Sequence, residues 1–177
     1  MPSSVAIGRP GPDEYASFYA GYIAHATDED LLGALAEQAD VVSSTFLGLP
    51  KHKVDFRYAE GKWTPREILG HLIDGERVFG FRSLWFARRD PSPLPGFEEN
   101  DWAAVSGHGE VPLEVLVEEF LTVRSGHLLM FQHLPADSWT RLGVANDKPV
   151  SVRAIAYVML GHVRHHLSVL KERYLVG

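Results

Sequence analysis

Thr64-Pro-Arg-Glu67 is the stretch of sequence that decides the fold, because it begins the most clearly marked helix in the chain. Thr64 and Glu67 have the spacing of a capping box, in which each side chain accepts a hydrogen bond from a backbone N–H at the helix start. Pro65 falls at the first helical position, where its missing N–H leaves nothing unsatisfied. Apolar residues then recur at helical spacing, so the sequence predicts a helix that ends near Arg89.

Three further stretches show the same helical spacing of apolar residues. They run from a cap at Thr27 to about Gly48, from Pro112 to about Leu134, and from a cap at Ser151 to about Tyr174. No alternating run is long enough for a sheet, so no strands are expected. Four helices of about 20 residues predict an all-α four-helix bundle. The connection from Asp90 to about Glu110 is long enough to allow parallel neighbours, and loops of that length are usually functional or disordered.

Residues 1–26 are expected to form an N-terminal arm and a short helix, and residues 27–177 the bundle. The arm is rich in Pro, Gly and Ser as far as Pro12. Beyond it, aromatic side chains at helical spacing predict a short helix docked on the body: Tyr15, Phe18, Tyr19 and Tyr22. The length of 177 residues suits one domain.

Composition excludes several classes of function. Lys and Arg total 17 against 23 Asp and Glu, a formal charge of -6, and a domain that binds nucleic acid normally has a basic excess. The sequence contains no Cys, so disulfides, thiolate metal sites and a cysteine nucleophile are ruled out. Any thiol chemistry would need a thiol supplied by a substrate. Neither a secretory signal nor a membrane span is recognisable, so a cytoplasmic location without membrane association is expected.

His162 and His166 are the first candidates for chemistry. They are four residues apart, so they lie on one face of the predicted last helix, and that face is its apolar stripe. A buried ring nitrogen without a partner costs about 1–3 kcal/mol, and a divalent metal would supply that partner. A hydrogen-bonded pair of core histidines is the competing interpretation. Val163 stands where the H-E-x-x-H motif has Glu, which disfavours a metallopeptidase.

His71 provides a third ring, because it lies one turn after the capping box and in phase with the apolar face. Helices of a bundle build metal sites by converging side chains in this way. Three histidines would leave an open position for water or substrate, as catalytic sites do.

The other polar candidates are weaker. Asp74 lies one turn beyond His71 and could orient a ligand by a hydrogen bond, or be an ordinary solvated carboxylate. His127 is on the apolar stripe of the third long helix, and His165 is expected at the rim. The remaining histidines fall at loops or helix ends and are expected at the surface: His25, His52, His108 and His133.

These residues together resemble the DinB/YfiT superfamily. The resemblance lies in three blocks and covers the chain from about Asp28 to Tyr174: Gly61-Lys-Trp63-Thr-Pro-Arg-Glu67-Ile-Leu-Gly-His71-Leu-Ile-Asp74-Gly-Glu76-Arg, then Pro95-Gly96-Phe97 with Asp101-Trp102, and Gly161-His162-Val-Arg-His165-His166. One departure is Leu167-Ser168, where many members have Gly-Gln, so packing near the site is expected to differ.

The resemblance implies a four-helix bundle, usually a homodimer, with a divalent metal (Zn, Ni or Fe) on His71, His162 and His166. Its characterised members include thiol S-transferases that use a low-molecular-weight thiol as cosubstrate. The expected function is therefore that of a metal-dependent enzyme on a small molecule, either an S-transferase, which the resemblance favours, or a hydrolase. A non-catalytic metal-binding stress-response bundle is the alternative, and a bis-histidine haem bundle is disfavoured by the ligand geometry.

Overall fold

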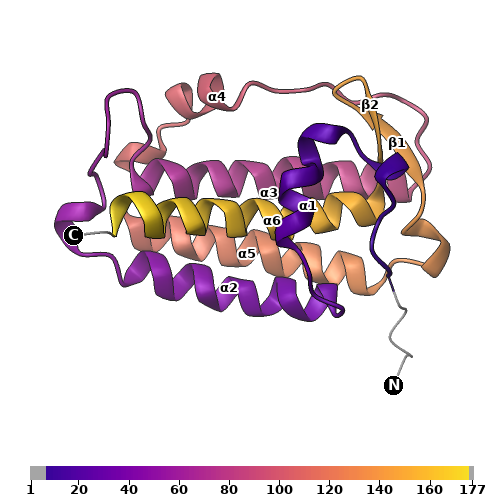
Figure 1. The fold of residues 1–177 in the computed structure, drawn as a ribbon, viewed down its shortest axis with the longest axis horizontal. Coiled ribbons are helices and arrows are strands. Elements are labelled where there is room, and N and C mark those ends of the chain that lie inside the picture. Colours follow the sequence, from indigo (N-terminus) through magenta and orange to yellow (C-terminus); the bar gives the residue numbers. More distant parts are fainter. Residues whose placement is uncertain (1–6, 176–177) are drawn as a thin grey trace.

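A computed structural model describes residues 7–175, and four long helices lie side by side along it (Figure 1). They are α2 (Leu31–Leu47), α3 (Pro65–Ala87), α5 (Leu113–Gln132) and α6 (Val152–Val169). The shorter elements are α1 (Ala20–His25), α4 (Glu99–Val105), β1 (Leu142–Ala145), β2 (Lys148–Ser151), 3-10 turns at Pro12–Glu14, Ser17–Tyr19, Lys51–Lys53, His108–Glu110 and Ala136–Ser138, and a π turn at Leu170–Tyr174. The predicted all-α four-helix bundle is confirmed. Residues 1–6 of the predicted arm and 176–177 of the predicted bundle lie outside the described residues.

Two of the predicted helix starts are built as the sequence indicates. The Thr64 hydroxyl accepts from the backbone N–H of Glu67 at 3.1 Å, and the Thr64 N–H donates to the Glu67 carboxylate at 2.7 Å. Ser151 caps α6 by accepting from the N–H of Ala154 at 3.1 Å. Local side-chain to backbone bonds therefore fix where α3 and α6 begin.

The predicted cap at Thr27 is wrong by one turn. Helix α2 begins at Leu31, with Asp30 as its cap. The difference is tertiary: Arg164 of α6 binds the Asp28 carboxylate, with N–O distances of 2.5 and 3.1 Å, and Asp28, expected in the first helical turn, lies before the helix instead.

Helix α5 runs parallel to α3, because the connection between them crosses the whole length of the bundle before α5 begins (Figure 1). Contacts agree with this direction, since Glu76 meets Arg124 and Gly80 meets His127 further along both helices. The long connection thus brings α4 back over the side of the bundle that α3 and α6 form.

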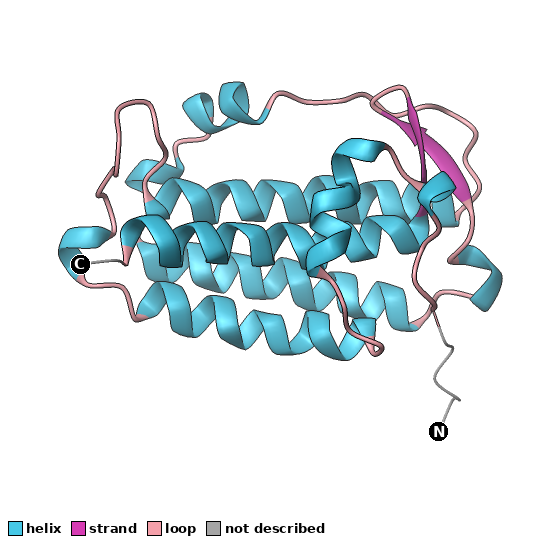
Figure 2. Ribbon diagram, in the orientation of Figure 1, coloured by secondary structure: helices cyan, strands magenta, loops and turns pink. Residues whose placement is uncertain are grey.

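The prediction that the chain forms no strands is wrong. Strands β1 and β2 form an antiparallel hairpin, shown in magenta in Figure 2, in which Leu142 pairs with Ser151. Its two-residue turn, Asn146-Asp147, has positive φ at both residues, the requirement of a tight hairpin turn. The strands have only four residues each, and Pro149 interrupts the second, so alternation in the sequence is too short to detect.

A polar layer divides the apolar core into two clusters. Each long helix contributes one buried polar residue to it, namely Gln38, Glu76, Arg124 and His162. Arg124 donates to Glu76 at 2.7 and 2.9 Å and to the Gln38 side chain at 3.1 Å. Because these bonds join three helices, they fix the relative height of the helices in the bundle.

Glycines permit close approaches between elements around the bundle. A side chain at Gly161 of α6 would overlap the backbone carbonyl of Tyr22, so α1 rests directly on α6. Along α3, the glycines Gly70, Gly75 and Gly80 each accommodate a histidine ring from another element, respectively His108, His162 and His127. No helix in residues 7–175 is long and apolar enough to cross a membrane.

Candidate metal centre

The structure brings the three predicted ligand residues together. His71 projects from α3, and His162 and His166 project from successive turns of α6. Their ring centroids are 4.7 to 4.9 Å apart, and one nitrogen of each ring lies within 4.8 Å of the others. The Nε2 atoms of His71 and His162 face each other at 2.8 Å. Among the described residues, this is the group whose side chains could hold a metal ion.

Aromatic side chains hold the rings in this arrangement. Trp63 lies against His71, with centroids 4.7 Å apart, and is nearly parallel to His166 at 6.4 Å. On the other side, Tyr22 and Phe79 make edge contacts with His162 at 5.2 and 5.8 Å. The ring orientations are therefore set by packing from three different segments.

Gly75 gives His162 its space on α3. A Cβ atom at this position would lie 3.1 Å from Cε1 of the ring, closer than ordinary van der Waals contact. A side chain there would push the His162 ring away from His71.

Burial keeps the three rings neutral. It lowers the pKa of His71 to about 4 and that of His166 to about 3, the latter with help from neighbouring histidines. The pKa of His162 is lowered well below its usual value by burial and then by His166 and His71. Neutral imidazole is the form that binds metal, so the donor set suits a divalent ion at neutral pH.

Two hollows reach the cluster. One has a volume of about 370 Å³ and includes His71 and His162, and the other, of about 240 Å³, includes His166 and Trp63. Both are bordered by Glu99 and Asn100 at the start of α4. The ring nitrogens are therefore within reach of a small molecule.

The structure places the weaker candidates outside this cluster. Asp74 is half-buried, and burial raises the pKa of its carboxyl group. The charged neighbours that also act on this pKa are His108, Arg77 and Glu119, and none of the three rings is among them. His127 lies 3.4 Å from the Glu76 carboxylate, in the polar layer. The role of Asp74 in orienting a ligand stays a prediction.

The other histidines are distributed mostly as expected. His165 is half-buried at the rim, where its ring centroid is 5.6 Å from that of Tyr22 and 6.2 Å from that of His25. His25, His52 and His133 are exposed. His108 is only partly exposed, because it packs onto Gly70.

Two residues beside the cluster were not identified as site residues from the sequence. Tyr22 was interpreted only as part of a docked aromatic stripe, and Glu99 only as part of the long connection. Both positions depend on where distant segments cross the bundle, and the sequence carries no local signal for that. The spacing of the aromatic stripe predicted a helix docked on the body, but it did not indicate that Tyr22, which is half-buried, contacts His162.

Known proteins that are similar to this chain are named for a dependence on metal. The chain is 26% identical over 146 residues to a protein of Geobacillus thermodenitrificans named "Putative metal-dependent hydrolase", covering 79% of this chain and 80% of that one. A protein of the same description from Geobacillus kaustophilus is 26% identical over 127 residues, covering 68% and 69% of the two chains.

A solved structure shows the same fold. YfiT from Bacillus subtilis, described as "a probable metal-dependent hydrolase with an unusual four-helix bundle topology", superposes with a TM-score of 0.68 over 96% of this chain and 94% of that one, at 16% identity. The family model described as DinB superfamily matches residues 34–170, more than three quarters of the sequence. The chain therefore belongs to the DinB superfamily.

Proposed function

We propose that this protein is a metal-dependent hydrolase that holds one divalent ion on His71, His162 and His166 and acts on a small molecule in the adjoining hollow. The observation that carries the proposal is the convergence of three neutral imidazoles from two helices, two of them buried and that of His166 half-buried, beside an open cavity. Three protein ligands leave a coordination position free, which distinguishes catalytic from structural sites. The names of the relatives support hydrolysis rather than another reaction of the same site.

The donor set fits Zn, Ni or Fe, because imidazole is a common ligand of all three. When bound, such an ion supplies Lewis acidity and lowers the pKa of water to about 7 in favourable sites. The chain itself contributes the orientation of the rings: Trp63 packs on His71 and His166, while Tyr22 and Phe79 fix His162. These apolar contacts also limit access of bulk water to the back of the rings.

The first test is metal content. Protein purified without a histidine tag should contain about one equivalent of metal. His162→Ala should lose most of it, because the substitution removes one of the three side chains that would bind the ion directly. His165→Ala is the matched control, since this residue is on the same helix but outside the three-ring group. Equal metal in wild type and His162→Ala would overturn the proposed site.

The second test is activity. Metal-loaded wild type should hydrolyse at least one member of a panel of small esters and amides, and chelation or His162→Ala should abolish the reaction. Conversion of an electrophile only after a thiol is added would overturn hydrolysis in favour of S-transfer. Metal-loaded protein that is inert toward both panels would favour a non-catalytic bundle.

A further inference from the structure

In the part of the chain that the structure describes, two arginines are buried, and only one of them has a carboxylate partner. Arg124 is 1% exposed and binds Glu76 through two hydrogen bonds. Arg82 is 4% exposed, yet it donates only to neutral oxygens, the carbonyl of Pro95 at 2.8 Å and the hydroxyl of Tyr19 at 3.3 Å. Within residues 7–175 no carboxylate lies at ion-pair distance from it. Buried charges are rarely left unpaired, so Arg82 is suited to bind an anion from outside the chain.

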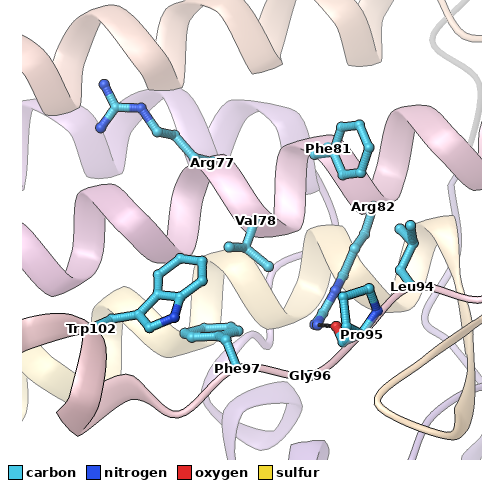
Figure 3. A pocket seen from close by; sticks show the side chains of 9 residues that line it. All are labelled: Arg77, Val78, Phe81, Arg82, Leu94, Pro95, Gly96, Phe97 and Trp102. Carbon is cyan, nitrogen blue, oxygen red and sulfur yellow. Dashed lines mark hydrogen bonds between the residues drawn. The ribbon is translucent and has the colours of Figure 1, made fainter.

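Arg82 borders an apolar cavity of about 330 Å³ between α3 and the following connection. Figure 3 shows Val78 on one side of it and the neighbouring rings of Phe97 and Trp102 on the other, with the Arg82 side chain reaching to the Pro95 carbonyl. The two ring centroids are 4.7 Å apart, and the guanidinium carbon lies 5.9 Å from the Phe97 centroid. The volume is within the range of small-molecule sites, about 300–1,000 Å³.

This cavity is the neighbour of the hollow at the histidines, and the two share three lining residues. Arg82, Gly96 and Phe97 line both spaces, and the second space includes His71 and His162. The guanidinium therefore lies between an apolar compartment and the three-ring cluster. A molecule that reached both would pass directly beside it.

We propose that Arg82 binds the carboxylate of the substrate, and that the apolar part of the same molecule, preferably an aromatic ring, fills the cavity against Val78, Phe97 and Trp102. The guanidinium fork matches carboxylate geometry, and the bonds to Pro95 and Tyr19 hold it in place before the ligand arrives. This proposal rests on the proposed function, because that function requires the reacting bond of the substrate to point toward the histidines. The predicted substrate class is a small aromatic carboxylic acid that carries a hydrolysable group.

A purely structural role for Arg82 makes a different prediction. In that role, its hydrogen bonds to Pro95 and Tyr19 would only hold the connection and the N-terminal segment against α3. Its loss would then lower stability, but the cavity would show no preference for a charged over an uncharged ligand of the same shape. The preference for an anion is therefore the quantity to measure.

Benzoate and its uncharged analogue benzamide are the probes. Binding is followed by the indole N–H signal of Trp102 in nitrogen–proton correlation spectra, which contain four such signals because the sequence has four Trp. Trp102→Phe identifies the signal. Wild type should bind benzoate at least about tenfold more tightly than benzamide, as expected for a hydrogen bond to a charged group.

Arg82→Gln should abolish that preference. Arg77→Gln is the matched control, because Arg77 also borders the cavity but is exposed and paired with Glu119 at 2.7 Å, and it should keep the preference within about threefold. If Arg82→Gln does not fold, Arg82→Lys retains the charge without the fork and should weaken benzoate binding severalfold. Equal affinities for the two probes in wild type, or an unchanged preference in the Arg82 variant that folds, would overturn the proposal.

The same titration in His162→Ala separates this site from the metal centre. The preference for benzoate should persist there, whether or not the wild type binds metal, because Arg82 is intact. Loss of the preference in His162→Ala would mean that the carboxylate binds at the histidines, and would overturn the assignment to Arg82. Metal content and hydrolysis test the proposed function independently of this result.

Discussion

Removing the carboxylate of Glu76 should be among the most damaging single changes to the fold. Glu76 is 2% exposed and is the acidic partner of Arg124 in the polar layer. In Glu76→Leu the guanidinium would remain charged inside the bundle, with only neutral acceptors left, the Leu35 carbonyl and the Gln38 side chain. A charge in that position is stabilised far less than one paired with a carboxylate.

The expected loss is about 3–5 kcal/mol, the usual cost of breaking a buried pair by removing one member. Because Arg124 keeps two neutral acceptors, the value should lie toward the lower limit. Domains are typically stable by about 5–15 kcal/mol, so the variant would lose a large part of its stability. For a chain of this length, a loss of about 3 kcal/mol corresponds to a fall in Tm of roughly 6–12 °C.

A double-mutant cycle measures the effect. Glu76→Leu, Arg124→Met and the double variant are unfolded with urea and followed by far-UV circular dichroism. The double variant should be more stable than Glu76→Leu, since it leaves no unpaired charge. Destabilisation of Glu76→Leu by less than about 1 kcal/mol, or a double variant whose loss equals the sum of the single losses, would refute the reasoning.

Further predictions concern the docking of α1, an exposed helix position and the response to acid. Gly161→Ala should destabilise by about 1–3 kcal/mol in urea unfolding, because its methyl overlaps the Tyr22 carbonyl, and an unchanged midpoint would contradict the packing. Gly126→Ala, where a Cβ meets nothing within 4 Å, should instead stabilise by about 0.5–1 kcal/mol, and a loss would count against it. The hydrogen bond from Arg153 lowers the pKa of Glu14 from 4.5 to about 2, so its contribution is complete above about pH 4.5 and is lost as the pH falls toward 2. Between these limits wild type should lose more of its free energy of unfolding than Glu14→Gln, by about 1–2 kcal/mol once solvent screening is allowed for, and parallel stability curves would disprove it.

The fold could be predicted wherever the deciding interactions are local. The starts of α3 and α6 depend on bonds between residues three apart, so the sequence around Thr64 and Ser151 contains the whole cause. The start of α2 could not be predicted in the same way, because Arg164, 136 residues away, engages Asp28. The hairpin was missed because Pro149 and the short strands conceal its pattern.

The same distinction applies to the site. His162 and His166 share a helical face by spacing alone, and the phase of the α3 capping box directs His71 inward. Arg82, in contrast, has the sequence appearance of any arginine on an amphipathic helix. Its burial without a carboxylate results from the path of the connection at Pro95, which no local pattern determines.

The three glycines of α3 have a consequence for protein engineering. They are five residues apart, so successive positions are rotated by about 140° and face three different sides of the helix. Each side is already occupied by an imidazole from another segment: His108, His162 or His127. This helix therefore cannot be exchanged between homologues as an independent module, and chimeras should carry it together with those partners. Libraries for directed evolution are better diversified in residues 94–102, where changes alter the cavity without disturbing these contacts.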